Sequence, residues 1–392
     1  MGIDAPQRPL KVFVSAGEAS GDLHAASLVE AMGREHPRLE VSCLGGPRLE
    51  KAGARVLVDN RALSLIGVLQ VFPKARTLYR AWKTLRDHLA SERPDLVILV
   101  DFPDFNFLLG RLARRLGLKV FYYISPQVWA WRRGRIRSLK RFVDAMAVIL
   151  PFEEAFYRRH GMKVHYVGHP LADTLSRVPD RAACRKALGL ENEPEQGFRA
   201  SRTVCLLPGS RRGEVRTFLP LLVEAARILH RRHGNLQFLV AAAAELDPSD
   251  FASVHPVRDL PLRIVHGDTH RVLRASDVAL AVSGTVTLEA ALLGTPLVIV
   301  YKVSPIEYHA GRFLIRVPCI GLPNLVAGRR VCPELIQEDA SPERIAGEAE
   351  RLLTDPRALN EQITGLREIE RRVGGPGAAR RAARIALSLC DC

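Results

Sequence analysis

The stretch D-V-A-L-A-V-S-G-T-V-T-L-E-A-A-L-L-G-T-P, residues 277–296, contains a strand, a tight turn and a helix in immediate succession. Asp277 to Val282 is an apolar run suited to a buried strand, Ser283-Gly284-Thr285 forms the turn, and Leu288 to Leu293 has helical spacing. Backbone N–H groups at the start of such a helix are free to bind an anion. Glu289, one turn into the helix, is placed to accept hydrogen bonds from sugar hydroxyls. The stretch favours a nucleotide diphosphate site, although a capped core helix shows the same short pattern.

The same alternation of a short apolar run with a helical stretch recurs along the 392 residues. It is typical of βα units around a parallel sheet. The length also exceeds what one hydrophobic core usually supports. The fold class is therefore predicted to be α/β, with two Rossmann-like domains, each built on a parallel sheet. The expected strands are 11–16, 96–100, 120–124 and 145–149 in the first domain, and 203–207, 236–241, 262–265, 277–282 and 297–300 in the second.

The domain boundaries follow from breaks in this pattern. Strand character is lost over 170–202, so a first domain is expected over 1–175 and a second over 176–355. Ser341-Pro342-Glu343 is typical of an N-cap followed by proline at the first helical position, and the remainder of the chain is predicted to be helical. We expect the helices of 356–392 to pack back on the first domain or on a partner subunit, with a glycine-rich break at 374–377.

The composition narrows the functional class. The chain has 57 Lys and Arg against 42 Asp and Glu, a net charge of +15, which favours an anionic partner such as nucleic acid, an acidic membrane or a phosphorylated substrate. An aromatic content of 6% and the absence of RNP, KH or zinc-finger spacing argue against nucleic acid. The 7 cysteines include no CxxC pair, and no apolar run approaches the roughly 18 residues that span a bilayer. We expect a cytoplasmic protein whose membrane contact is peripheral.

The loop S-A-G-E-A-S-G-D, residues 15–22, follows the first predicted strand. It lies at the carboxyl edge of the sheet, where open α/β sheets bind their ligands. Its two carboxylates, Glu18 and Asp22, suit it to hydroxyls or amides better than to phosphate. The alternative is that Asp22 caps a helix and Glu18 is merely solvated.

A second polar segment, D-F-P-D-F-N at 101–106, follows the apolar run 96–100. A carboxylate at the end of a buried parallel strand is partly desolvated, which raises its pKa and suits it to act as a general base. Asp101 is the predicted base and Asp104 the competing one. Asp101 could instead cap the next helix.

The second domain opens with a comparable loop, P-G-S-R-R-G-E-V at 208–215. It lacks the Lys-Ser/Thr pair of a Walker loop, which speaks against a nucleoside triphosphatase. Arg211 stands beside the Gly-Ser turn, where its guanidinium could neutralise a diphosphate leaving group. No such role is predicted for Arg212.

Two further segments indicate a membrane surface. S-P-Q-V-W-A-W at 125–131 runs into six cations, which fits an interfacial or phosphate-binding helix almost as well as a solvated one. The apolar run 63–72 precedes a basic helix, and Val68, Leu69 and Phe72 form the predicted membrane patch, with a buried linker as the alternative. No metal site is predicted, because the histidines form no ligand cluster and no Asp-x-Asp is present.

Taken in order, these motifs make the chain similar to the lipid-A-disaccharide synthases, glycosyltransferases of Gram-negative bacteria that join two acylated glucosamines. The likeness covers nearly the whole length and is carried by G-E-A-S-G-D, D-F-P-D-F-N, S-P-Q-V-W-A-W-R, L-L-P-G-S-R, S-G-T-V-T-L-E and L-P-N-L at 322–325. The resemblance implies a GT-B fold, in which two Rossmann-like domains face a cleft, and a metal-independent enzyme without a cofactor at the inner membrane.

The resemblance also implies the reaction. UDP-2,3-diacylglucosamine would donate its sugar to 2,3-diacylglucosamine 1-phosphate with inversion, giving a β-1,6-linked disaccharide and UDP. Asp101 matches the family's proposed base and Arg211 its essential arginine. Because the family's last helices can exchange between subunits, a homodimer is an open alternative.

The remaining site residues carry over in the same way. On the donor side we expect Ser283, Gly284 and Thr285 at the phosphates, with Glu289 and Asn324 at the nucleotide. On the acceptor side we expect Glu18, Ser20, Asp22 and Asn106.

Two alternatives remain at this stage. Another GT-B enzyme acting on UDP-N-acetylglucosamine, an epimerase or a muramyl-type transferase, would share the Ser-Gly-Thr helix and its glutamate. A basic, non-catalytic membrane or nucleic-acid binding protein would explain the charge but would leave the turn motifs without a role.

Overall fold

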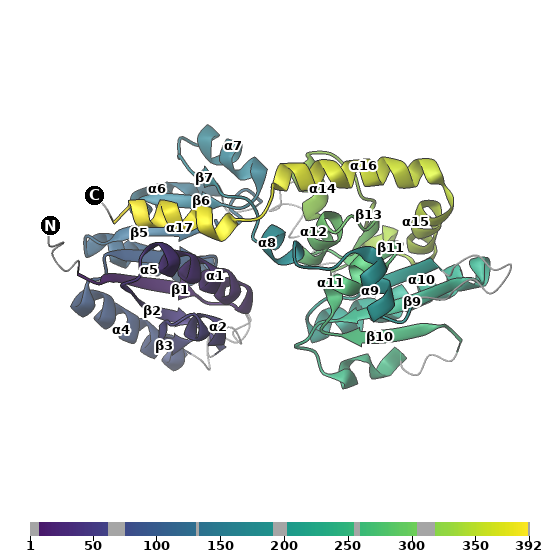
Figure 1. Cartoon of the computed structure of the whole chain (residues 1–392), viewed down its shortest axis with the longest axis horizontal. Helices are drawn as coiled ribbons and strands as arrows, with labels where there is room; N and C mark the ends of the chain where they lie inside the picture. The colour runs from purple at the N-terminus through teal and green to yellow at the C-terminus, as the bar shows by residue number, and fades with distance from the viewer. Residues whose placement is uncertain are drawn as a thin grey trace, which may run out of the picture. The chain divides into compact units, whose positions relative to one another are not determined.

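The computed structural model describes residues 8–61, 75–130, 133–190, 202–254, 259–303 and 318–390. The chain divides into two compact units, residues 1–170 with 376–392, and residues 171–375. Each unit is a parallel sheet flanked by helices (Figure 1). The predicted α/β class with two Rossmann-like domains is thus confirmed.

The first unit alternates strands and helices from its start. Its strands are β1 (Leu10–Ala16), β2 (Leu39–Gly45), β3 (Arg55–Asp59), β4 (Leu96–Val100), β5 (Lys119–Tyr123), β6 (Ala145–Val148) and β7 (His165–Tyr166). Its helices are α1 (Ala19–Glu35), α2 (Pro47–Lys51), α4 (Ala75–Glu92), α5 (Pro103–Arg115), α6 (Ile136–Phe142), α7 (Pro151–Arg159) and α17 (Ala378–Ser388). The strand order is β3-β2-β1-β4-β5-β6-β7, with parallel pairing throughout.

The second unit repeats the plan. Its strands are β8 (Arg202–Leu207), β9 (Leu236–Ala242), β10 (Leu262–His266), β11 (Val278–Val282), β12 (Leu297–Tyr301) and β13 (Glu334–Ile336), in the order β10-β9-β8-β11-β12-β13. Its helices are α8 (Leu171–Leu175), α9 (Arg181–Ala187), α10 (Arg212–His233), α11 (Thr269–Ala275), α12 (Thr285–Leu292), α14 (Leu322–Ala327), α15 (Pro342–Thr354) and α16 (Pro356–Val373).

Apolar residues on both faces of each sheet build the cores. Every residue of β4 and of β11 is buried, which is why these strands read as continuous apolar runs in the sequence. Alternate residues of the first sheet belong to two separate hydrophobic clusters, one on each face. Both faces are therefore covered, as a doubly wound sheet requires.

The helices after residue 355 were predicted to pack together on the first domain or on a partner subunit. In the structure they divide between the two units. α16 packs on α12, α14 and α15 within the second unit, whereas α17 packs on α1 in the first. Gly374, with a φ of +77°, ends α16 in a backbone conformation that favours glycine. The boundary between the units also lies at residue 170 rather than 175, because α8 contacts α12.

The first unit holds α17 through an alanine face. Ala382, Ala383 and Ala386 are buried in the same cluster as residues of α1. The guanidinium of Arg381 donates to the carbonyl of Val167 at 2.8 Å. This last helix completes the covering of one face of the first sheet (Figure 1).

Candidate functional site

In each sheet the strand order reverses at one point. The carboxyl ends of the two strands that meet there define the candidate site residues of that unit. β1 and β4 are neighbours in the first sheet, with Ala16 opposite Val100, while β2 and β5 lead away in opposite directions. β8 and β11 occupy the same position in the second sheet, with Leu207 opposite Ala281. Open α/β sheets bind ligands at the carboxyl ends of such strand pairs. The loops that follow these four strands are the ones that the sequence predicted as sites.

The turn at Asp101 is strained. Asp101 and Phe102 both have a φ of +43°, a left-handed conformation that non-glycine residues seldom adopt. Three hydrogen bonds support it: the side-chain amide of Asn106 donates to the carbonyls of Val100 at 3.1 Å and Asp101 at 2.8 Å, and the Tyr122 hydroxyl donates to the Asp101 carbonyl at 2.8 Å. Backbone strain held in this way is a frequent feature of functional sites.

Asn106 is therefore a support for this turn. Its side chain is fully buried, and its carbonyl oxygen accepts a hydrogen bond from the Ser15 hydroxyl at 2.6 Å. A contact between Asn106 and an acceptor would require these hydrogen bonds to break, so what the structure shows for this residue is support of the Asp101 turn.

A close approach ties the two loops of the first unit together. A Cβ atom on Gly17 would lie 2.2 Å from the ring of Phe102, so only glycine fits at this position. The side-chain amide of buried Asn60 donates to the carbonyl of Ala16 at 3.2 Å. The loop after β1 is thus held against the turn after β4.

The electrostatics of Asp101 match those of a general base. Burial, and then the nearby carboxylate of Glu18, raise the pKa of Asp101 to about 6, while the backbone N–H of Phe102 lowers it in part. The competing candidate Asp104 is exposed and forms an ion pair with Arg135. A carboxyl with a pKa near 6 can exchange a proton near neutral pH, which suits Asp101 to act as a general base.

The predicted acceptor-side residues of the loop after β1 divide into two groups. Glu18 and Ser20 are exposed and free to meet a ligand. Asp22 is buried and accepts hydrogen bonds from the backbone N–H groups of Gly46 at 2.7 Å, Arg48 at 3.0 Å and Leu49 at 3.3 Å. Asp22 therefore caps α2 within the fold, the alternative that its sequence position left open.

In the second unit, Arg211 stands at the start of α10, directly after the loop that leaves β8. Its side chain is 82% exposed, and its nearest anionic partner, Glu214, is 3.8 Å away. The Glu214 carboxylate accepts from the backbone N–H groups of Ser210 at 2.9 Å and Arg211 at 3.3 Å, which fixes the turn. The guanidinium of Arg211 is consequently available to an anion.

The turn after β11 leads into α12. Gly284 and Thr285 are exposed, and the N–H groups at the start of an α-helix have no partner within that helix. The N–H of Ser283 donates to the carbonyl of Val300 at 2.9 Å and so belongs to the sheet. Any anion bound here meets the helix end from Gly284 onward.

Glu289 has a partner that the sequence did not reveal. The imidazole of His270, on α11, lies 3.2 Å from the Glu289 carboxylate. The hydrogen bond to Glu289 raises the pKa of His270, against a smaller opposing effect of burial. The pair holds the Glu289 side chain in one orientation, half-buried at the end of the sheet.

Asn324, predicted at the nucleotide, is instead occupied within the unit. Its amide donates to Cys332 O and Glu334 Oε1, and its oxygen accepts from Val331 N and Cys332 N, all at 2.7–2.8 Å. These four bonds use the full capacity of an asparagine side chain. Glu334 also accepts from Gly321 N at 2.9 Å, so Asn324 organises the loop that leads into α14.

Other predicted features lie elsewhere. The membrane patch Val68, Leu69 and Phe72 is outside the described residues. Among the helices that the structure describes, none is long and apolar enough to cross a bilayer. The same described residues contain no cluster of three or more His, Cys, Asp or Glu side chains suited to a metal ion.

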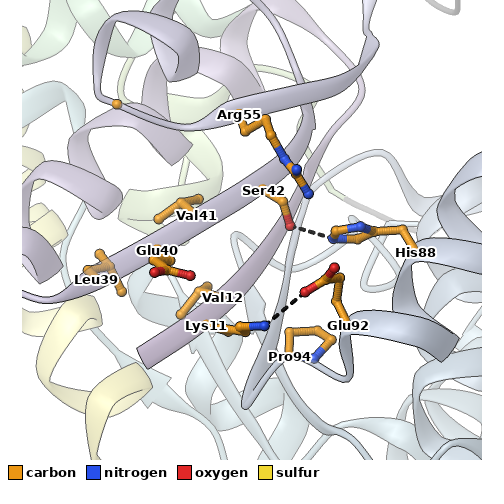
Figure 2. A pocket seen from close by; sticks show the side chains of 11 residues that line it. Lys11, Val12, Leu39, Glu40, Val41, Ser42, Arg55, His88, Glu92 and Pro94 are labelled. Atoms are coloured by element: carbon orange, nitrogen blue, oxygen red, sulfur yellow. Dashed lines mark hydrogen bonds and ion pairs between the residues drawn. The ribbon is translucent and has the colours of Figure 1, made fainter. Parts of the chain in front are cut away.

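An open pocket of about 400 Å³ lies at the opposite, amino end of the first sheet (Figure 2). Four of its polar groups form two pairs: Lys11 with Glu92, and Ser42 with His88, both at 2.8 Å. It lies away from the point where the strand order reverses, so we assign the site to the carboxyl edge.

Comparison with known proteins identifies the family. A family model described as lipid-A-disaccharide synthetase matches residues 12–383. The chain is 45% identical to the lipid-A-disaccharide synthase of Geobacter sulfurreducens over 97% of both chains. It is 46% identical to that of Syntrophus aciditrophicus, over 96% of this chain and 97% of the relative.

Solved structures agree on the fold. A UDP-GlcNAc 2-epimerase from Neisseria meningitidis bound to UDP-GlcNAc superposes with a TM-score of 0.61 at 13% identity, covering 96% of this chain and 98% of that one. MurG of Acinetobacter baumannii gives a TM-score of 0.60 at 15% identity, covering 97% and 100%. These likenesses establish the GT-B fold, and the sequence relatives establish what is built on it: the chain belongs to the lipid-A-disaccharide synthase family, glycosyltransferases of lipid A biosynthesis.

Proposed function

We propose that this enzyme transfers the sugar of UDP-2,3-diacylglucosamine to the 6-hydroxyl of 2,3-diacylglucosamine 1-phosphate, with inversion at the anomeric carbon. The products are a β-1,6-linked disaccharide 1-phosphate and UDP. The bond between the anomeric carbon and the UDP oxygen breaks as the acceptor oxygen attacks from the opposite face. The acceptor hydroxyl loses its proton, and UDP leaves with the bonding electron pair.

Asp101 carries this proposal as the general base. It lies at the carboxyl end of β4, at the point where the strand order reverses, and its pKa near 6 leaves the carboxylate ionised at neutral pH yet basic enough to take a proton. Glu18 and Ser20 are the exposed groups of the neighbouring loop that we assign to the acceptor sugar.

The second unit supplies the donor half of the chemistry. Arg211 and the start of α12 both offer positive charge at the carboxyl ends of β8 and β11, and we assign them to the diphosphate of UDP. Glu289, held by His270, is assigned to the ribose hydroxyls. Preorganised donors of this kind stabilise developing negative charge by about 3 kcal/mol each, so the proposal requires no metal ion or other cofactor.

We also propose that the enzyme works as a peripheral protein on the cytoplasmic face of an anionic membrane, because its substrates are acylated. The net charge of +15 and the exposed side chain of Leu108 on α5 support this. Binding to vesicles should weaken as salt rises if electrostatic attraction contributes.

The direct test is UDP release by the purified full-length chain. Release should require both UDP-2,3-diacylglucosamine and 2,3-diacylglucosamine 1-phosphate. Epimerisation of UDP-N-acetylglucosamine in the absence of the acceptor, without disaccharide formation, would overturn the proposal.

Arg211→Ala provides the matching test of the donor half. The turnover number should fall about a hundredfold, as it does when one donor to a developing charge is removed. Arg212→Ala is the matched control, because the neighbouring Arg212 is already paired with Asp250 at 3.2 Å. Equal effects of the two substitutions would show that only the general charge matters.

A further inference from the structure

The segment after β5, residues 124–130, forms a second strained turn beside that of Asp101. β5 pairs with β4 in parallel, with Val100 opposite Tyr123, and the N–H of Asp101 donates to the carbonyl of Tyr123 at 3.4 Å. Ile124 has a φ of +63°, a left-handed conformation that a β-branched residue adopts only under constraint. Two strained turns therefore follow neighbouring strands at the same edge of the sheet.

A buried carboxylate holds this second turn. The Ser125 hydroxyl donates to Glu153 at 2.5 Å, and the other carboxylate oxygen accepts from the N–H groups of Ile149 at 3.2 Å and Leu150 at 2.9 Å. Burial raises the pKa of Glu153 to about 7, and these hydrogen bonds offset only part of that effect. An acidic side chain kept in such surroundings is costly, and its contact with Ser125 is what distinguishes it from an ordinary helix cap.

Apolar packing also fixes residues 124–130 in place. Trp129 is 6% exposed, and its ring meets that of Phe152 edge to face at 4.9 Å. Val128 is buried as well, and its N–H donates to the carbonyl of Pro126 at 2.6 Å. The segment is thus anchored on both sides of residue 127.

Gln127 is the exception within this anchored segment. Over residues 124–129, all of which the structure describes, its side chain alone is exposed. A carboxamide both donates and accepts hydrogen bonds, which suits it to the hydroxyl groups of a sugar. A rigid turn that buries its other side chains and presents one amide is what a recognition contact requires, because little side-chain and loop entropy is lost on binding.

We propose that Gln127 contacts the sugar of the acceptor substrate, and that Glu153 is the positioning residue that fixes Gln127 through Ser125. The inference rests on the proposed function, in which Asp101, at the end of the adjacent strand, receives the proton of the acceptor hydroxyl. Gln127 touches the substrate, whereas Glu153 does not.

Gln127→Ala tests the contact. The KM for 2,3-diacylglucosamine 1-phosphate should rise about three- to tenfold, the value of one neutral hydrogen bond, while kcat and the KM for the UDP-sugar change less than twofold. An unchanged acceptor KM in an otherwise active enzyme would overturn the inference. If the wild-type protein releases no UDP when both substrates are present, the proposed function itself fails. The two failures are therefore distinguishable.

A double-mutant cycle tests the positioning role. Ser125→Ala removes the hydrogen bond to Glu153 and should raise the acceptor KM severalfold, and combining it with Gln127→Ala should add little, because both act on one contact. Additive effects would show that the buried carboxylate does not act through Gln127.

The carboxylate itself is tested with a conservative pair. Glu153→Gln can still accept from the backbone N–H groups and donate to Ser125, and it should keep the acceptor KM within about twofold of wild type, whereas Glu153→Ala should raise it as Ser125→Ala does. Glu154→Gln, on the same helix and 43% exposed, is the matched control and should have no effect. If Glu153→Ala does not fold, the serine variant alone decides; equal acceptor KM values for Glu153→Gln and Ser125→Ala would overturn the positioning role.

Discussion

The pH dependence of the reaction is the most direct measure of the site at Asp101. If Asp101 is the base, kcat/KM must follow the ionisation of this carboxyl in the free enzyme. With a pKa of about 6, the carboxylate is about 91% ionised at pH 7 and about 9% at pH 5. The rate should therefore fall about tenfold between these two values, whereas an unperturbed aspartate would leave it nearly constant.

Glu18→Gln separates the two causes of the raised pKa. Burial is the larger cause and the negative charge of Glu18 the smaller, so removing that charge should lower the pKa of Asp101 below 6 without restoring its ordinary value. The acid limb of the profile should move to lower pH accordingly. Initial rates of UDP release from pH 4.5 to 8, at constant ionic strength and with the acceptor well below its KM, give the acid limb of the wild type and that of Glu18→Gln.

Asp101→Asn should remove the limb together with at least about a hundredfold of the rate, the usual contribution of a general base. Asp104→Asn is the matched control three residues away, and it should retain both the rate and the profile. A wild-type limb near pH 4, or a larger loss from Asp104→Asn than from Asp101→Asn, would refute the assignment of the base.

Two further perturbations test how the site is held. His270→Ala should cost about 1 kcal/mol of stability and weaken UDP binding severalfold in calorimetric titration, because Glu289 loses its partner; an unchanged Kd would show that Glu289 needs no such support. The ion pair forms only while His270 is protonated, so its contribution to stability is present at low pH and is lost as the pH rises through the raised pKa. Gly17→Ala should lower the free energy of unfolding by about 1–3 kcal/mol and reduce kcat/KM, because the new Cβ displaces the ring of Phe102. Gly33→Ala, whose Cβ meets nothing within 4 Å, is its control, and a similar melting temperature and rate for the two variants would contradict the close approach.

Apart from β10, the strands predicted from the sequence are those that are largely buried. Residues 96–100 and 297–300 form continuous apolar runs, and the corresponding strands lie where they were expected. β2 and β3 were not predicted, because they are partly exposed and carry polar residues, and β13 has only three residues. Burial on both faces leaves a clear pattern in sequence, whereas half-burial at the margin of a sheet does not.

The candidate site was predictable where it depends on chain order. Asp101 follows directly after β4, and Arg211 ends the short loop after β8, so the parallel topology alone brings each of them to the carboxyl edge of its own sheet. Polar neighbours are harder to assign: Asp22 and Asn324 stand in comparable motifs, yet their hydrogen bonds go to groups of their own unit. Whether a polar group faces a ligand or the fold depends on partners far away in the sequence.

Residues that act through distant partners left no signal at all. Glu153 is one glutamate at the start of a helix, 28 residues beyond the serine that it holds. His270 lies 19 residues before its carboxylate partner. Only the three-dimensional arrangement shows that each supports a loop of the candidate site.

The last helix has a consequence for the synthesis of the protein. α17 fills one face of the first sheet, although residues 171–375 of the second unit are made before it. During translation the second unit can therefore complete its core first. The apolar surface of α1 that α17 covers stays exposed until residues 378–388 have left the ribosome. The two units can thus complete their cores in the reverse of their order along the chain, and the first unit keeps an apolar surface uncovered until its last helix has been made.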